Sequence, residues 1–167
     1  MAKAKSAIPE GFHTVTPVLC LDDARPAIEW YKRVLGAVEV SSHPGPDGKI
    51  MHGEIRIGGS PIMFHDAMMG FKGPKALGGS PVGLWIYVED SDTLFNRAVA
   101  EGVEVGMPFG DQFWGDRCGA FTDPFGYVWT IATRKEDLTE DELMQRQEAM
   151  FKDMAGQPQC APDAQGQ

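Results

Sequence analysis

The sequence has few cysteines, and they follow no pattern that would indicate a disulfide framework. Only Cys20, Cys118 and Cys160 occur among the 167 residues, and none belongs to a Cys-X-X-Cys motif. Such a sparse, odd-numbered set is typical of a reduced protein, so a cytoplasmic location is predicted. Cys20 and Cys118 lie in apolar, strand-like surroundings, which favours small core residues over reactive thiols.

Long apolar runs and an excess of positive charge are also missing. No apolar run approaches the roughly 20 residues that a membrane-spanning helix needs. The basic start of the chain lacks the apolar stretch of a secretory signal. There are 24 acidic against 15 basic residues, which gives a formal net charge of -9. Because such a surface repels phosphate backbones and anionic lipids, neither nucleic acid nor a membrane is expected as a partner.

Common nucleotide-binding and catalytic motifs are absent. The sequence contains no Gly-X-Gly-X-X-Gly, no Walker phosphate loop, no His-Glu-X-X-His and no Gly-X-Ser-X-Gly. Dinucleotide binding, nucleotide hydrolysis, zinc proteolysis and α/β-hydrolase chemistry therefore have no support. What remains is an ordinary globular composition, with 43% hydrophobic and 23% charged residues, in a chain long enough to bury a core.

The chain repeats itself. An apolar run, an acidic pair, a helical pattern and a glycine occur in this order twice, and landmark residues recur 67 positions apart: Asp23 as Asp90, and Gly59 as Gly126. We therefore predict two copies of one βαβββ unit of about fifty residues. The expected strands and helices are 14–21, 24–35 (helix), 37–42, 50–57 and 60–65, then 82–88, 91–101 (helix), 103–107, 117–122 and 127–133.

This pattern predicts the organisation of the whole chain. A Gly-rich linker joins the units, and its Met68, Met69 and Phe71 are apolar enough that we expect it to pack on the protein. Thr139 begins a capping-box signal for a helix over 140–154, and the tail that follows has a disordered composition. The predicted segments are an N-terminal arm (1–12), the first unit (13–66), the linker (67–80), the second unit (81–135), the C-terminal helix (136–154) and the tail (155–167).

Three sequence motifs resemble those of a known superfamily. They are Trp-Tyr-Lys-Arg-Val-Leu-Gly at 30–36, Asp-Gln-Phe-Trp-Gly-Asp-Arg at 111–117 and Thr-Asp-Pro-Phe-Gly-Tyr-Val-Trp at 122–129. Together with the repeat, they resemble the PhnB-like branch of the vicinal oxygen chelate superfamily, which includes glyoxalase I, bleomycin-resistance proteins and extradiol dioxygenases. The resemblance implies an α+β fold in which the tandem βαβββ units form a cupped mixed sheet around a small organic molecule. It also implies a homodimer.

The resemblance further implies where a metal would bind. Glyoxalase-type members take one ligand from the first and last strand of each unit, and those positions are here Thr16, Met63, Gly83 and Thr130. None of these residues is a His, Asp, Glu or Cys donor. His65 lies two residues after Met63 on the same side of the strand, but one ligand does not hold a catalytic metal. We therefore expect no metal at the usual site and no other cofactor.

Strand alternation separates side chains that face the cup from side chains that face the helices. If Gly83 faces the cup, so do Trp85 and Tyr87, whose rings could stack on and hydrogen-bond to a flat ligand. Alternatively, these aromatics only fill the cup. The opposite phase is predicted to form the core: Ile62, Phe64, Leu84, Ile86, Val88, Trp129 and Ile131.

The clearest polar pattern is on the strand 50–57. On the cup side, His52 and Glu54 could bind a metal or form an acid–base pair held by Arg56. On a solvated face, the three would form only charge pairs. We take His52 and Glu54 as candidate catalytic residues, and the candidate ligand-binding residues are Trp85, Tyr87, His65, Arg56, Trp114 and Arg117.

Other features of the second unit have weaker functional implications. Asp116 and Arg117 come from the strand equivalent to 50–57 and allow the same two interpretations. Trp114 is interpreted as part of an aromatic lid or a packing corner, because aromatics supply no proton chemistry. The segment 123–126 is interpreted as a hairpin turn without a chemical role.

Three functions remain open. The first is a metal-free protein that captures a small organic molecule in an aromatic cup at a homodimer interface. The second is an enzyme, a lyase, isomerase or dioxygenase of the superfamily, that uses His52, Glu54 and His65 with or without a displaced metal. The third is a structural dimer without a ligand.

Overall fold

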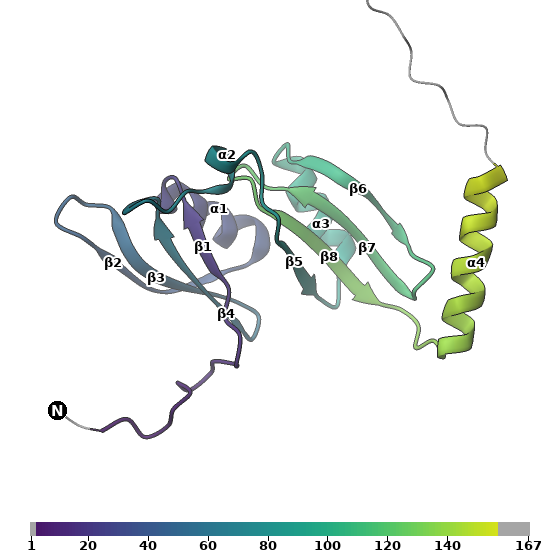
Figure 1. The fold of residues 1–167 in the computed structure, drawn as a ribbon, viewed down its shortest axis with the longest axis horizontal. Coiled ribbons are helices and arrows are strands. Elements are labelled where there is room, and N and C mark those ends of the chain that lie inside the picture. The colour runs from purple at the N-terminus through teal and green to yellow at the C-terminus, as the bar shows by residue number, and fades with distance from the viewer. Residues whose placement is uncertain (1–2, 157–167) are drawn as a thin grey trace, which may run out of the picture.

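The computed structural model describes residues 3–156, which form two βαβββ units and a C-terminal helix (Figure 1). The first unit contains β1 (Val18–Leu21), α1 (Ala24–Leu35), β2 (Val38–Pro44), β3 (Ile50–Ile57) and β4 (Ser60–Asp66). The second contains β5 (Gly83–Tyr87), α3 (Ser91–Ala100), β6 (Glu104–Asp111), β7 (Asp116–Thr122) and β8 (Val128–Arg134). The predicted α+β class and tandem repeat are confirmed.

Each unit forms its own four-stranded mixed sheet, in the orders β1-β4-β3-β2 and β5-β8-β7-β6. The strand register preserves the repeat, because Val18 pairs with Met63 and, 67 positions later, Trp85 pairs with Thr130. The cupped sheet that the resemblance implies is thus divided in two, since no described strand of one sheet pairs with a strand of the other.

Helix α1 shows why these residues form this element. The Asp23 side chain accepts a hydrogen bond from the Arg25 backbone N–H at 3.1 Å and caps the start of the helix. The apolar residues Ile28 and Tyr31 are buried, as the helical spacing predicts. The helix ends at Gly36, whose φ of 69° belongs to the left-handed region that glycine adopts easily.

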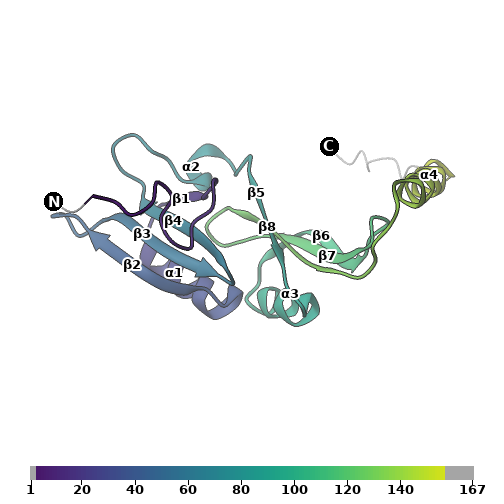
Figure 2. The same ribbon diagram turned by 90° about the horizontal axis from the view of Figure 1, so that it is seen from below.

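Both main helices lie on one side of the sheets (Figure 2), and α1 contacts α3. The core lies between these helices and the sheets, and its largest fully buried side chains include Trp129, Tyr31, Phe64 and Phe121. The predicted core residues Ile62 and Ile131 are buried there too. The sheet faces opposite α1 and α3 are called the open faces below.

Asp123 joins the two units from inside the core. Its side chain is 4% exposed and accepts hydrogen bonds from the Tyr31 hydroxyl on α1 and the Trp129 indole N–H, both at 2.8 Å. It also accepts from the backbone N–H groups of Phe125 and Tyr127. Burial raises the pKa of this carboxyl, although the four donors act in the opposite direction. The segment 123–126 is a turn as predicted, but its first residue also links α1 to the second sheet.

Tyr127 explains in part why the two sheets remain separate. Its hydroxyl accepts a hydrogen bond from the Cys20 backbone N–H at 2.9 Å and donates one to the Cys20 carbonyl at 3.0 Å. Cys20 lies on β1, the edge strand of the first sheet, so the tyrosine takes the place that a neighbouring strand would occupy. Because these groups are already bonded, β1 has no free hydrogen-bonding groups at Cys20 to offer β5.

The connecting segments differ from the expected ones in detail. The linker contains a short helix, α2 (Pro74–Leu77), that the sequence did not indicate, and β1 begins at Val18 rather than at residue 14. Helix α4 (Glu140–Gly156) extends past the predicted residue 154 and stands beyond the second sheet in Figure 1. Within residues 3–156, no helix has the length and apolar character needed to cross a membrane. The composition predicts a disordered tail from residue 155, but residues 155–156 belong to α4; the rest of the predicted tail, residues 157–167, lies outside the described residues.

Candidate functional site

The open face of the second sheet carries two exposed aromatic side chains. Trp85 and Tyr87 on β5 are 48% and 58% exposed, and their ring centroids lie 6.0 Å apart. Leu84 and Ile86, which alternate with them, pack against the core, as the alternation predicts. The structure therefore places both predicted aromatics where a ligand can reach their rings.

Asp116 on β7 binds the hydroxyl end of Tyr87 and also the neighbouring Trp114. One of its carboxylate oxygens, Oδ2, accepts a hydrogen bond from the Tyr87 hydroxyl at 2.8 Å and another from the Trp114 indole N–H at 3.1 Å. Asp116 itself is 3% exposed. The hydrogen bond to Asp116, followed by burial, raises the pKa of Tyr87, so the phenol stays protonated at neutral pH. The Tyr87 hydroxyl and the Trp114 indole N–H thus face the protein, and the Tyr87 ring remains accessible to a ligand.

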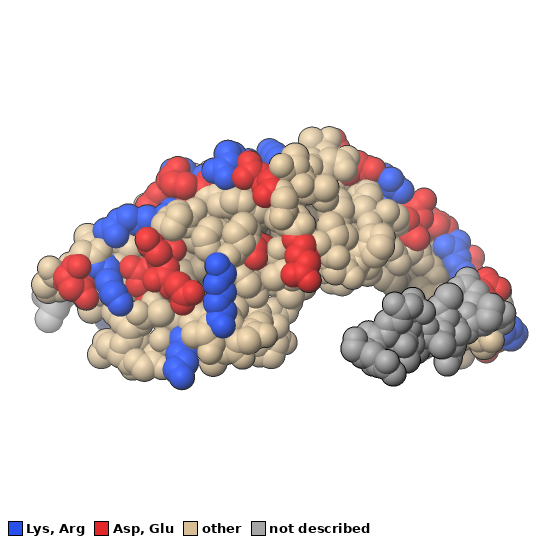
Figure 3. Space-filling view, turned by 90° about the horizontal axis from the view of Figure 1, so that it is seen from above, with Lys and Arg blue, Asp and Glu red and all other residues tan. Residues whose placement is uncertain are grey.

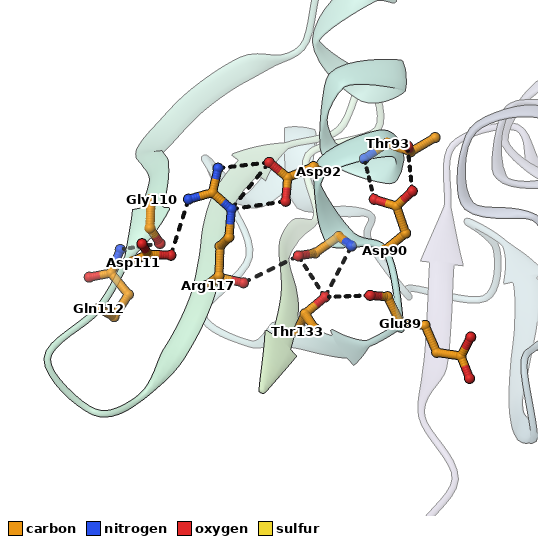
Figure 4. Close-up of polar contacts among 10 residues, drawn as sticks. Glu89, Asp90, Asp92, Thr93, Gly110, Asp111, Gln112, Arg117 and Thr133 are labelled. Carbon is orange, nitrogen blue, oxygen red and sulfur yellow. Dashed lines mark hydrogen bonds and ion pairs between the residues drawn. The ribbon is translucent and has the colours of Figure 1, made fainter. Parts of the chain in front are cut away.

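Arg117 lies on the other side of the same strand. Its guanidinium pairs with Asp92 on α3 at 2.7 Å and with Asp111 at 3.1 Å (Figure 4). Side chains on a strand point alternately to opposite faces, so Arg117 points toward α3 when Asp116 points toward the open face. The structure therefore separates Arg117 from the other candidate ligand-binding residues and gives it ion pairs that connect β7, β6 and α3.

The open face of the first sheet is more polar. His52, Glu54 and Arg56 alternate along β3 on the open face, and His65 occupies the same face of β4. Arg56 contacts Glu54 at 3.3 Å and donates a hydrogen bond to the Gly11 carbonyl of the N-terminal arm at 3.2 Å. The structure thus brings four candidate residues onto one face.

Neighbouring segments occupy part of this polar face. The Arg56 guanidinium lies over the Phe12 ring, with its central carbon 5.7 Å from the ring centroid. The Phe71 ring of the linker lies edge-on to His65 at 5.3 Å, which confirms that the linker packs on the protein. His52 stacks on His43 of β2, with ring centroids 6.3 Å apart. Arg56 and His65 are therefore less accessible to a ligand than Trp85 and Tyr87.

A cavity of about 310 Å³ lies where the two units meet. It is lined by His13, Val15 and Pro17 of the N-terminal arm, by the β3–β4 turn, and by residues 84–88 on and after β5. The volume reaches the lower end of the range of known small-molecule sites. Charged side chains lie along the outer side of the arched molecule and also over the first unit (Figure 3). Trp85 and Tyr87 themselves line the cavity, so the cavity and the aromatic face form one candidate site at β5.

The two cysteines within the described residues fit a structural role. Cys118 is fully buried on β7, and Cys20 is partly buried on β1. Burial is the main cause that raises the pKa of both thiols, so neither is activated as a thiolate.

Comparison with known proteins decides the family. A family model described as the Glyoxalase/Bleomycin resistance protein/Dioxygenase superfamily matches residues 12–131. The chain belongs to this superfamily. The resemblance inferred from the sequence motifs is thereby confirmed, and within the superfamily the solved structures that are similar to this chain include a PhnB protein.

Relatives in the superfamily agree with this assignment. "Uncharacterized protein Rv0887c" of Mycobacterium tuberculosis (strain ATCC 25618 / H37Rv) is 40% identical over 134 residues, covering 77% of this chain and 79% of that protein. Protein PA1353 from Pseudomonas aeruginosa has a similar structure, with a TM-score of 0.61, 26% identity, and coverage of 74% of this chain and 99% of that chain. The PhnB protein from Bacillus cereus shares the fold, with a TM-score of 0.58, 20% identity, and coverage of 72% and 99%.

The residues at the superfamily's usual metal positions do not fit a metal. Met63 on β4 and Thr130 on β8 occupy equivalent places in the two units. Met63 pairs with Val18 in the first sheet, and Thr130 pairs with Trp85, the equivalent of Val18, in the second. A thioether, two threonine hydroxyls and a glycine do not provide the imidazole, carboxylate or thiolate donors that a divalent metal needs. Within residues 3–156, no three His, Cys, Asp or Glu side chains lie close enough together to hold a metal ion.

Proposed function

We propose that this protein binds a small organic molecule on the aromatic open face of the second sheet, without the superfamily's metal centre. The observation that carries this proposal is the exposed pair of Trp85 and Tyr87 beside the cavity at β5. Large aromatics are usually buried, as Trp129 and Phe121 are here. Two of them side by side on an open face, with the Tyr87 hydroxyl bonded to Asp116, form a surface suited to a flat ligand.

The donor chemistry supports binding over metal-dependent catalysis. Thr16, Met63, Gly83 and Thr130 offer no carboxylate or imidazole, so activation of a metal-bound water has no basis at these positions. A catalytic alternative would have to use His52, Glu54 and His65, which share the open face of the first sheet. In that case the protein should either bind a metal or have an acid–base activity. His52→Ala should then abolish the metal binding or the activity.

The open faces also support a homodimer. Val18 and Val38 of the first sheet are 55% and 64% exposed, and Trp85 and Tyr87 add to the apolar surface of the second. Soluble monomers rarely expose so many large apolar side chains on one side. We propose that a second copy covers these faces and closes each half-cup. Light scattering should then give twice the monomer mass of 18.2 kDa, and a stable monomer at micromolar concentration would contradict the dimer.

Fluorescence titration and metal analysis test the binding function together. We expect protein purified without added metal to contain no stoichiometric zinc, nickel or iron, and at least one compound in a panel of planar aromatics to quench its tryptophan fluorescence saturably. Trp85→Ala should weaken the binding, whereas the matched variant Phe151→Ala, which removes an equally exposed aromatic on α4, should not. A stoichiometric metal, or equal binding by both variants, would contradict the proposal.

A further inference from the structure

We propose that the aromatic face of the second sheet selects a planar organic cation, and that the buried carboxylate of Asp116 provides this selectivity. The proposal rests on the binding function above and names the chemical class of the ligand. Asp116 does not touch the ligand: its charge acts on the ligand from a distance, across the Tyr87 and Trp114 side chains that it holds.

The first supporting observation is the uneven use of the two Asp116 oxygens. Oδ2 accepts both hydrogen bonds, whereas the buried Oδ1 has no hydrogen-bond partner among the described residues. Buried polar atoms are nearly always paired, so an unpaired carboxylate oxygen needs a specific explanation. Its negative charge lies on β7, at the hydroxyl end of the Tyr87 ring that a ligand would contact.

The second observation is that no Lys, Arg or His within residues 3–156 makes a direct ion-pair contact with this carboxylate. Arg134 is next to Asp116 in the strand register and attracts it electrostatically, but its Nε donates to Asp137 at 2.7 Å and it forms no ion pair with Asp116. No ion pair to Asp116 is formed by any Lys, Arg or His in residues 3–156. The formal charge of the whole protein is -9. A ligand that brings a positive charge to the open face would therefore add to the distant attraction of Arg134 a counter-charge of its own.

The third observation is the direction of the Tyr87 hydrogen bond. A phenol that donates to a carboxylate becomes more electron-rich, because hydrogen-bonded groups polarise one another. A more electron-rich ring attracts a cation over its face more strongly. Trp85, tilted by 32° to Tyr87, offers a second ring next to the first. The two rings, and the carboxylate at the hydroxyl end of Tyr87, thus favour the same kind of ligand, one that is flat and positively charged.

Three probes of similar shape and different charge test this inference. They are proflavine, which is a cation at neutral pH, neutral acridone, and anionic anthracene carboxylate. The positive charge of bound proflavine would be separated from the Asp116 carboxylate by one aromatic ring. The attraction between these two unit charges should make proflavine bind about tenfold more tightly than acridone at low salt. Anthracene carboxylate should bind least tightly, and added salt should reduce the differences.

Asp116→Asn isolates the charge. The aspartate and asparagine side chains are nearly identical in shape. The amide oxygen of the asparagine can still accept both hydrogen bonds, so Tyr87 and Trp114 keep their positions. The proflavine-to-acridone affinity ratio should fall about tenfold toward one, while acridone affinity stays unchanged. Asp153→Asn removes the same charge from the exposed end of α4 and should leave the ratio as in the wild type.

The outcomes separate this inference from the binding function. Equal wild-type affinities for the three probes, or a ratio that Asp116→Asn leaves unchanged, would overturn the preference for cations while binding itself stands. A loss of acridone binding in Asp116→Asn would show that the residue only maintains the structure, which also overturns the proposal. If the wild type binds none of the three probes, both proposals fail.

Discussion

Replacing Asp123 by asparagine should destabilise the protein strongly, because this side chain receives four donors inside the core. Oδ1 accepts from the backbone N–H groups of Phe125 and Tyr127, and Oδ2 accepts from Tyr31 and Trp129. An asparagine can direct its oxygen to only one of these pairs, and its NH₂ group then faces the other. The Tyr31 hydroxyl can rotate and accept from that NH₂, but the Trp129 indole can only donate.

The expected loss follows from this arrangement. A buried donor without an acceptor costs about 1–3 kcal/mol, and a lost hydrogen bond to a charged group about 1.5–3 kcal/mol. We therefore expect Asp123→Asn to lower the free energy of unfolding by about 2–4 kcal/mol. Tyr31→Phe removes only one donor and should cost about 1–1.5 kcal/mol. The double variant should lose less than the sum, because both changes affect one network.

Urea denaturation, followed by tryptophan fluorescence and far-UV circular dichroism, measures these losses. The denaturant slope should stay constant, so that the midpoint reports stability alone. The exposed Asp153→Asn serves as the control and should change the unfolding free energy by less than about 0.5 kcal/mol. If Asp123→Asn behaves like this control, or if the losses are fully additive, the network around Asp123 does not hold the two units together as described.

Three further predictions concern pH, the edge of β1 and the face that Arg117 occupies. Because burial raises the pKa of Asp123, the proton-linked part of its contribution to stability is full below the ordinary Asp pKa and is lost as the pH rises through the raised value. The difference in unfolding free energy between wild type and Asp123→Asn, measured by urea denaturation, should therefore decrease from pH 4 upward. An increase with pH would contradict a raised pKa of Asp123. Tyr127→Phe leaves the Cys20 N–H and carbonyl without their partner and should cost about 1–2 kcal/mol in the same assay; no loss would remove our explanation for the separate sheets. Arg117→Met should lower the melting temperature, because it breaks the pair with Asp92, but leave ligand affinity unchanged; a weaker affinity would place Arg117 in the site.

Much of the fold could be predicted because it follows from local periodicity. The 67-residue repeat fixes both units, and the period of two along a strand correctly separates Trp85 and Tyr87 from Leu84 and Ile86. The same alternation shows that Asp116 and Arg117, as consecutive strand residues, point to opposite faces. That signal was available in the sequence, and it distinguishes the residue below the aromatic face from the one beside α3.

The interactions between the units could not be predicted in this way. Asp123 meets Tyr31 across 92 positions, and Tyr127 meets Cys20 across 107. No local pattern encodes such pairings, since they depend on how α1 and β1 pack against the β7–β8 turn. For the same reason the sequence indicated a turn at Asp123 but not its burial, and it implied one cupped sheet where the structure has two.

The most direct test of the central claim compares proflavine binding with and without a chelator in wild type and in Trp85→Ala. Proflavine fluorescence reports binding, and EDTA removes any divalent metal from the protein. We predict that the wild-type dissociation constant is the same with and without EDTA and that Trp85→Ala binds about tenfold more weakly or worse. Binding that EDTA abolishes and added metal restores, or undiminished binding by Trp85→Ala, would contradict a metal-free site on this aromatic face.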